Sequence, residues 1–170
     1  MRLIGLDPGL KTTGWGVVDV AGSRIAHVEN GSVSTDARSP IGERLARLYD
    51  GLVAVIERLE PDEAAVEETF VNPNAASTLK LGLARGVVIL APARAGLPVA
   101  EYSANAIKKS VVGFGHAEKA QIQAMVRRLL PGVEFGGPDA ADALALAICH
   151  AHHAASRGTI ARALAAQGRR

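Results

Sequence analysis

The sequence is poor in cysteine and in aromatic residues, and each shortage narrows what the chain can be. Its single cysteine, Cys149, cannot form a disulfide within the chain, which favours a reducing cytoplasm. Aromatic side chains make up only 4% of the residues, so a core must be built from Leu, Val, Ile and Ala. Since 48% of the 170 residues are hydrophobic, the chain has enough material for one ordinary globular domain.

The sequence also lacks the segments and motifs that mark several large protein classes. No basic stretch followed by an apolar one opens the chain, because Asp7 and Lys11 interrupt it. The apolar run 86–93 is too short to cross a bilayer, so we expect a cytoplasmic protein with no membrane partner. Neither a Gly-rich phosphate-binding loop with its lysine nor a Ser-His-Asp or Cys-His nucleophile pattern is evident.

Charge is unevenly distributed along the chain, although the net charge is only +2. Residues 1–79 carry 7 basic and 12 acidic side chains, whereas residues 80–170 carry 12 basic and 5 acidic ones. A basic half beside an acidic half suits a polyanionic partner together with a local carboxylate cluster. Charge alone is equally typical of lysines and arginines that solvate helix surfaces.

Hydrophobic periodicity and turn residues predict ten elements. They are strands at 1–7, 10–20 and 23–34, a helix at 40–60, a strand at 62–68, a helix at 75–94, a strand at 97–102, and helices at 103–112, 117–130 and 139–156. Hairpins link the first three strands, and the later strands alternate with helices. We therefore expect an α/β fold with a mixed five-stranded sheet, its first three strands antiparallel, flanked by helices.

The predicted domain covers residues 1–156 and is followed by a basic tail. Residues 157–170 contain four arginines, no acidic residue and little apolar content beyond alanine. We expect this tail to be a frayed helix or disordered.

The first strand ends in a carboxylate that a turn leaves uncovered. Asp7 closes the apolar run, and Pro8-Gly9 then forces a turn before the second strand begins. An aspartate in this place often bonds the backbone of the turn that follows it. From the first strand alone, that interpretation is as good as a catalytic one, and the choice depends on partners for Asp7.

Three further carboxylates are candidates to join Asp7. Glu67 ends the predicted strand 62–68 and reaches Asp7 if the first and fourth strands are adjacent and parallel. Asp139 and Asp142 lie three apart in the first turn of the last helix and share a face. Four acids in one place need metal, and hard oxygen ligands favour Mg²⁺ or Mn²⁺ over zinc. Two such ions would hold a phosphate, activate a water and neutralise the leaving oxyanion.

Each of these acids also has an ordinary structural explanation. Aspartate is common in the first turn of a helix, where it caps amides, so Asp139 and Asp142 taken alone favour capping. Of Glu67 and Glu68 only one can face the site, and we prefer Glu67 because it completes the apolar strand. His150 lies about 12 Å along a helix from Asp142, so the histidines there are more typical of surface or packed residues.

Six stretches of the chain can be compared with known families. They are Ile4-Gly-Leu-Asp7-Pro-Gly9, Thr13-Gly14-Trp-Gly16, Val66-Glu67, Lys80-Leu-Gly-Leu-Ala-Arg-Gly86, Val111-Val-Gly-Phe-Gly-His-Ala-Glu-Lys119 and Pro138-Asp139-Ala-Ala-Asp142-Ala-Leu-Ala. Together they resemble the RuvC family of bacterial Holliday-junction resolvases, crossover junction endodeoxyribonucleases. The resemblance covers residues 1–155, and the motifs are highly specific in combination.

The resemblance implies a ribonuclease-H-like fold, a homodimer, and Mg²⁺-dependent paired nicking of four-way DNA junctions. By motif position, the metal-binding and catalytic acids are Asp7, Glu67, Asp139 and Asp142. Some members of the family have a histidine at the position of Asp139, whereas this chain has the carboxylate. The family also suggests the RuvA–RuvB branch-migration complex as a partner. It does not explain the basic tail.

Basic and aromatic residues around these acids are predicted to contact DNA. Lys119 is also expected near the scissile phosphate, where its charge would stabilise developing negative charge. Phe70, three residues past Glu67, would stack on an unpaired base or else fold back on the core. The predicted DNA-binding residues are Phe70, Lys80, Arg85, Lys108, Lys109 and Lys119.

A two-fold dimer would place two sites for symmetric cuts. In the helix 75–94, Gly82 and Gly86 lie four apart on one face, together with the apolar Leu79, Leu83 and Val87. We predict that this face is the dimer interface, although it would serve equally well as ordinary core.

Three other functions compete with the resolvase. An ATP-binding fold of the actin, Hsp70 and sugar-kinase type begins similarly but needs a second lobe, for which 170 residues leave no room. A ribonuclease-H-like nuclease that processes structured RNA has a similar first motif, but the 108–119 region and the Asp139/Asp142 helix fit a junction enzyme better. A catalytically silent DNA binder is disfavoured because all four acids are present.

Overall fold

The computed structural model describes residues 1–68 and 74–167, with side chains up to residue 155. The strands are β1 (Arg2–Asp7), β2 (Thr12–Ala21), β3 (Arg24–Ser34), β4 (Glu63–Glu67) and β5 (Val99–Tyr102). The helices are α1 (Ile41–Leu59), α2 (Ala75–Arg94), α3 (Ala104–Val112), α4 (Lys119–Leu129) and α5 (Pro138–Gln167). All ten predicted elements are confirmed, nine of them with bounds that agree within a few residues.

The five strands form one mixed sheet in the order β3-β2-β1-β4-β5. β1 pairs antiparallel with β2, and β2 pairs antiparallel with β3. β4 runs parallel to β1 on its other side and parallel to β5 at the edge. The predicted mixed sheet and the predicted adjacency of the first and fourth strands are therefore confirmed.

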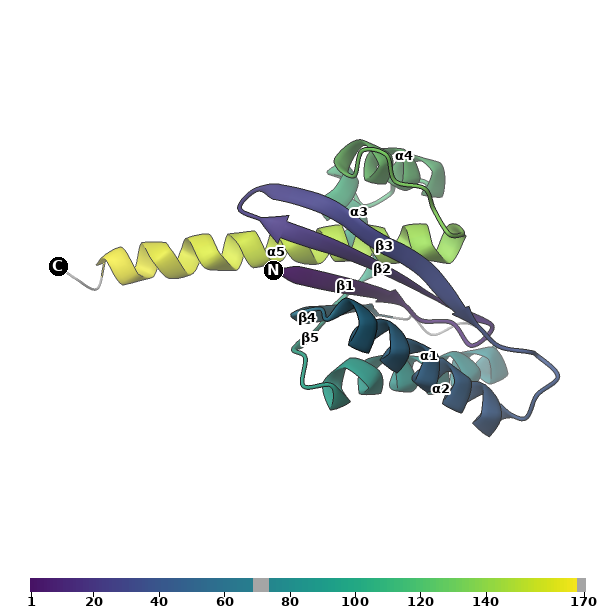
Figure 1. Cartoon of the computed structure of the whole chain (residues 1–170). Coiled ribbons are helices and arrows are strands. Elements are labelled where there is room, and N and C mark those ends of the chain that lie inside the picture. The colour runs from purple at the N-terminus through teal and green to yellow at the C-terminus, as the bar shows by residue number, and fades with distance from the viewer. Residues whose placement is uncertain (69–73, 168–170) are drawn as a thin grey trace.

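Helices cover both faces of this sheet (Figure 1), with α1 and α2 on one side and α3, α4 and α5 on the other. Alternation along β1 sends Ile4 and Leu6 into the core under α1 and α2, and Leu3 into the core under α5. Because side chains alternate along a strand, Asp7 shares the α5 face with Leu3. The first strand thus delivers its terminal carboxylate to the side where α5 begins.

Glycines in the two central strands let α5 lie close to the sheet. A methyl group at Gly5 would collide with the backbone oxygen of Ala143, and one at Gly14 with the backbone oxygen of Asp139. Both collisions are with helix backbone, which cannot move aside as a flexible side chain can. These glycines therefore set how near the N-terminal turns of α5 come to β1 and β2.

The last helix is longer than the sequence predicted. Its backbone continues to Gln167, eleven residues past the expected end at 156, and Figure 1 shows it extending away from the sheet. The segment is rich in alanine, which has the highest helix propensity, and it contains no proline to stop the helix. The division into a domain and a basic tail stays a prediction.

Helix α2 packs only one of its faces. Ala84, Val88 and Ala91 are buried, whereas Leu79 and Leu83 on the opposite side are 68% and 42% exposed. A methyl group at Gly82 or Gly86 would meet nothing within 4 Å, so this outer face is not core of the single chain.

The outer face also makes α2 apolar overall. Among the described residues, α2 is the one helix that is long and apolar enough to cross a membrane by length and composition alone. From the sequence, the apolar run 86–93 was too short to predict a membrane-spanning helix. Core helices of globular proteins share this length and composition. The inner face of α2 packs against α1 and the sheet.

Candidate active site

Asp7 ends β1 beside a turn that another residue holds. The hydroxyl of Thr13 donates a hydrogen bond to the Gly9 carbonyl at 2.8 Å, and the Gly9 amide donates to the same hydroxyl oxygen at 3.3 Å. Thr13 is fully buried, so this small network keeps the Pro8-Gly9 turn in place without using the carboxylate. The turn-forming explanation of Asp7 is therefore unnecessary, and its side chain remains directed to the α5 face.

Glu67 reaches the same place from β4. Leu6 pairs with Val66 in the parallel ladder, so the strand ends that carry Asp7 and Glu67 lie side by side. Ala64 and Val66 belong to the core under α1 and α2, and Ala65 belongs to the core under α5. Alternation therefore directs Glu67 to the α5 face and Glu68 away from it, as predicted.

The third side of the site comes from two helix N-termini. Asp139 and Asp142 lie in the first turns of α5, and Lys119 is the first residue of α4. The Lys119 ammonium donates to Oδ2 of Asp142 at 2.6 Å. Asp142 is thus engaged with a cation rather than with a helix amide, which argues against a capping role for it.

Burial and mutual repulsion raise the pKa of the two strand carboxylates. The pKa of Asp7 rises to about 8, first because of burial and then because of the nearby charges of Glu67, Asp142 and Asp139. Burial also raises the pKa of Glu67, and Asp142 adds to the effect. Lys119 acts in the opposite sense on both carboxyls, and Asp142 in turn raises the pKa of Lys119. The cluster carries more negative charge than its lysines neutralise.

The donor chemistry of this cluster fits a hard divalent cation. Its ligands are carboxylate oxygens, which Mg²⁺ and Mn²⁺ prefer, and extra positive charge would relieve the mutual repulsion of these carboxylates. In the described part of the chain, however, no three Asp, Glu, His or Cys side chains are arranged as a ready-made metal site.

A cavity of about 250 Å³ opens beside these groups. Apolar side chains of α3 and α4, among them Ile107 and Ile122, form part of its wall. Its charged lining consists of Glu67, Lys108, Lys119 and Asp142. The cavity thus brings two lysines and two carboxylates to one opening, a composition suited to a phosphate beside a cation.

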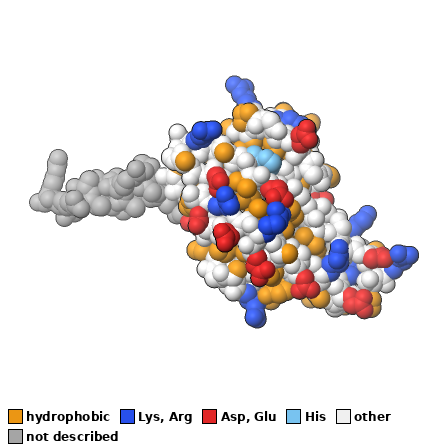
Figure 2. Space-filling view, viewed as in Figure 1, with side chains coloured by type: hydrophobic (Ala, Val, Ile, Leu, Met, Phe, Trp, Pro, Cys, Tyr) orange, Lys and Arg blue, Asp and Glu red, His pale blue; other side chains and the backbone are white. Residues whose placement is uncertain are grey.

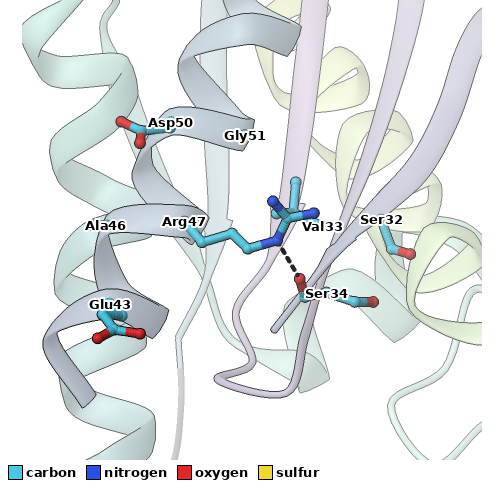
Figure 3. Close-up of a pocket in the computed structure, with 8 residues that line it drawn as sticks. All are labelled: Ser32, Val33, Ser34, Glu43, Ala46, Arg47, Asp50 and Gly51. Atoms are coloured by element: carbon cyan, nitrogen blue, oxygen red, sulfur yellow. Dashed lines mark hydrogen bonds between the residues drawn. The ribbon is translucent and has the colours of Figure 1, made fainter. Parts of the chain in front are cut away.

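A larger hollow of the described surface lies elsewhere. It occupies about 520 Å³ between β3 and α1, and Arg47 reaches across it to donate to the Ser34 carbonyl at 3.1 Å (Figure 3). Glu43 and Asp50 flank Arg47 on α1, and none of the four predicted acids lines this hollow. Size therefore does not mark the reactive site in this molecule.

The predicted DNA-binding residues are not all in one place. Lys108 and Lys119 line the cavity with Glu67, whereas Lys109, the next residue after Lys108, lines a different groove beside His152. Lys80 is exposed on α2, beside a hollow next to α1. Phe70 lies outside the described residues, so its two alternatives stay open.

Arg85, the remaining predicted DNA-binding residue, is paired within the protein. Its guanidinium forms an ion pair with Glu101 of β5 and donates to the backbone carbonyl of Glu67 at 3.4 Å. The sequence contained no signal for this pairing, because α2 and β5 meet only once the chain has folded.

The late histidines are packed or surface residues, as predicted, and His153 is the exposed one. His150 is buried, with Nδ1 2.9 Å from the Tyr102 hydroxyl and Nε2 2.9 Å from Oε2 of Glu63. His152 lies 3.1 Å from the Ser110 hydroxyl. These contacts tie α5 to β4, β5 and α3.

Charges of both signs are interspersed on the face shown in Figure 2. The acidic and basic halves of the sequence therefore do not become an acidic and a basic half of this face. Folding mixes them because β1 and β4, from the acidic half, lie beside α5, from the basic half.

Comparison with known proteins decides the family. The model of the family described as crossover junction endodeoxyribonuclease RuvC matches residues 3–150. The chain belongs to the RuvC family. RuvC of Paracoccus denitrificans is 63% identical over 157 residues, which cover 92% of this chain and 95% of that protein. RuvC of Rhodospirillum rubrum is 60% identical over 169 residues, covering 99% and 100%. RuvC proteins are metal-dependent nucleases, so this chain is an enzyme of that class.

Solved structures agree with this assignment. Thermus thermophilus RuvC, solved in complex with a Holliday junction substrate, superposes with a TM-score of 0.85 at 36% identity, over 92% of this chain and 96% of that one. The yeast mitochondrial resolvase Ydc2 superposes with a TM-score of 0.63 at 15% identity, over 88% and 77%. The second likeness shows the shared ribonuclease-H-like fold alone, and the expected fold class is confirmed.

Proposed function

We propose that this chain resolves four-way DNA junctions by paired, symmetric nicks, in DNA recombination and repair. The observation that supports this most directly is the meeting of Asp7, Glu67 and the α5 acids at one edge of the sheet, beside Lys119. The Holliday junction bound by the Thermus relative supports the substrate. The cytoplasm, where bacterial DNA lies, is the expected location.

Asp7, Glu67, Asp139 and Asp142 are the groups that would hold metal in this proposal. When bound, two Mg²⁺ or Mn²⁺ ions would position the phosphate, activate a water and neutralise the leaving oxyanion. Lys119 pairs with Oδ2 of Asp142, and an ion that took this oxygen would free the Lys119 ammonium for a phosphate oxygen. Lys108 lines the same cavity and would contact a neighbouring phosphate.

The outer face of α2 is the proposed interface of a homodimer. Leu79, Leu83 and Leu90 are 68%, 42% and 48% exposed, and Gly82 and Gly86 between them leave room for a close backbone. Exposed apolar surface of this kind marks protein interfaces. A two-fold axis there would use α2 of both copies and give two identical sites, one for each nick.

The test compares three substrates in Mg²⁺, in Mn²⁺ and with chelator: a four-way junction, plain duplex of the same sequence, and structured RNA. We expect two symmetric nicks in the junction, slow cutting of the duplex, and none with chelator. Equal cutting of duplex and junction would contradict the proposal. Preferential cutting of the RNA would favour the alternative nuclease of the same fold.

A branch-migration complex of the RuvA–RuvB type is the proposed protein partner. This rests on family resemblance alone. The check is whether purified RuvA and RuvB change the rate of junction nicking by this chain, compared with the same proteins without ATP.

A further inference from the structure

Arg85 lies between three elements of the fold. It projects from the middle of α2, its ion pair with Glu101 reaches β5, and its Nε donates to the Glu67 carbonyl at the end of β4. The Arg85 side chain is only 26% exposed. A guanidinium engaged on two sides in this way is poorly placed to contact a DNA phosphate as well.

The bonded carbonyl belongs to the residue whose carboxylate is in the proposed metal site. β4 ends at Glu67, and the Glu68 amide makes a last ladder bond to the Tyr102 carbonyl at 2.9 Å. Because the carbonyl and the side chain of Glu67 share one Cα, a bond that fixes the carbonyl also restricts where the carboxylate points.

We propose that Arg85 is a positioning residue for Glu67, held in place by Glu101, and is not a DNA contact. It keeps the last residue of β4 against the sheet, so that Glu67 faces Asp7 and Asp142. This rests on the proposed function for the role of Glu67. Groups that orient metal ligands typically change metal affinity or activity 10- to 100-fold when they are replaced, and a loss of about that size is expected here.

Four variants separate the roles. Arg85→Gln removes the charge and most of the donor geometry, and Arg85→Lys keeps one charged donor in case the first variant folds poorly. The double variant Arg85→Glu with Glu101→Arg keeps an ion pair but removes the donor that α2 supplies to the Glu67 carbonyl. The control is Arg58→Gln, which breaks a comparable ion pair, Arg58–Glu29 at 2.6 Å, between α1 and β3.

Three measurements are made on the full chain. The first is hydrogen exchange of the Glu68 amide in the DNA-free protein, and the second is its Mn²⁺ affinity. The third is junction affinity in chelator at several salt concentrations. We expect Arg85→Gln to speed Glu68 exchange at least tenfold and to weaken Mn²⁺ binding about tenfold. Junction affinity in chelator and its salt dependence should match those of Arg58→Gln.

Two results would overturn the proposal. One is unchanged Glu68 exchange together with a salt-dependence slope that falls by about 1, which identifies a phosphate contact. The other is full recovery of Mn²⁺ binding in the double variant. The ion pair between positions 85 and 101 would then be sufficient to position Glu67, and the hydrogen bond from Arg85 to the Glu67 carbonyl would not be needed. The exchange measurement needs no DNA or metal, so it remains informative even if the wild-type chain fails to cut junctions.

Discussion

The ammonium nitrogen of Lys119 lies 2.6 Å from Oδ2 of Asp142. The two residues are 23 positions apart and lie near the N-termini of different helices, so this contact joins α4 to α5 across the opening of the site. Lys119 acts there as a cation for the carboxylate cluster. A bound metal ion would compete with it for Asp142, and the freed ammonium would be available for DNA.

Replacing Lys119 should therefore separate metal affinity from catalysis. In Lys119→Ala, Mn²⁺ should bind the DNA-free protein more tightly, because Asp142 no longer has a competing partner. Single-turnover nicking should nevertheless slow about 100-fold, since a charge that stabilises the transition state is lost. Calorimetric Mn²⁺ titration and junction nicking are the measurements. Normal nicking by Lys119→Ala would remove the phosphate role, and Arg128→Ala, an exposed cation later in α4, serves as control.

Binding and cutting should come apart in Asp7→Asn. Junction binding depends on basic side chains such as Lys108, whereas cutting depends on the carboxylate cluster. We expect the junction dissociation constant to change less than threefold, while nicking falls at least 1,000-fold. Gel-shift and nicking assays on the same preparation measure both. A variant that cuts at even a tenth of the wild-type rate would place Asp7 outside the metal site.

The raised pKa of Asp7 predicts how the metal-free protein responds to pH. In the unfolded chain an aspartate titrates near pH 4, but in the folded protein the Asp7 pKa is about 8. The folded state therefore holds a proton that the unfolded state has lost between these values. The contribution of Asp7 to the stability of the folded state is therefore complete below pH 4 and is lost as the pH rises through 8.

Asp7→Asn removes this titration, which gives a direct measurement. With chelator present, the urea unfolding free energy of the wild type should fall between pH 5 and pH 8.5 by on the order of 2 kcal/mol more than that of Asp7→Asn. Part of the pH dependence of the unfolding free energy remains in Asp7→Asn, because burial raises the pKa of Glu67 as well. Parallel pH profiles for the two proteins would contradict the assignment.

A charge on the outer face of α2 should separate the proposed dimer. Leu83 is 42% exposed in the single chain and would be buried between two copies, so Leu83→Glu should yield monomers of unchanged fold. Light scattering measures the mass, and circular dichroism checks the fold. Phe114→Glu is the matched control, because Phe114 is 49% exposed on a different surface. A wild-type chain that is already monomeric at micromolar concentration would rule out this interface.

Much of the site could be predicted from the sequence because strand ends and helix starts are local signals. Asp7 and Glu67 each end an apolar run that predicts a strand. If these two strands are parallel neighbours, both carboxylates lie at the same edge of the sheet. The start of the last helix placed Asp139 and Asp142. The two bridges, Lys119 to Asp142 and Arg85 to Glu67, could not be predicted, because each depends on how packed elements approach one another.

The role of the glycines in β1 and β2 could not be predicted from the sequence. Gly14 and Gly16 alternate along β2, so both face the same side of the sheet, and the close approach of α5 explains why these two positions have no side chain. The length of α5 was missed for a related reason. Alanine-rich sequence continues a helix with no change of pattern, so nothing local announces an end at 156.

Gly14 offers the sharpest test of how the helix is held against the sheet. In Gly14→Ala the new methyl group would collide with the Asp139 backbone, so the first turn of α5 must shift and carry Asp139 and Asp142 away from Asp7. We expect a loss of about 1–3 kcal/mol in unfolding free energy and at least a tenfold loss of nicking. Gly42→Ala, in the first turn of α1 with nothing within 4 Å, is the control and should keep both. If Gly14→Ala is destabilised but nicks normally, the spacing between α5 and the sheet serves stability alone, and the carboxylates reach the phosphate from a wider range of positions than proposed.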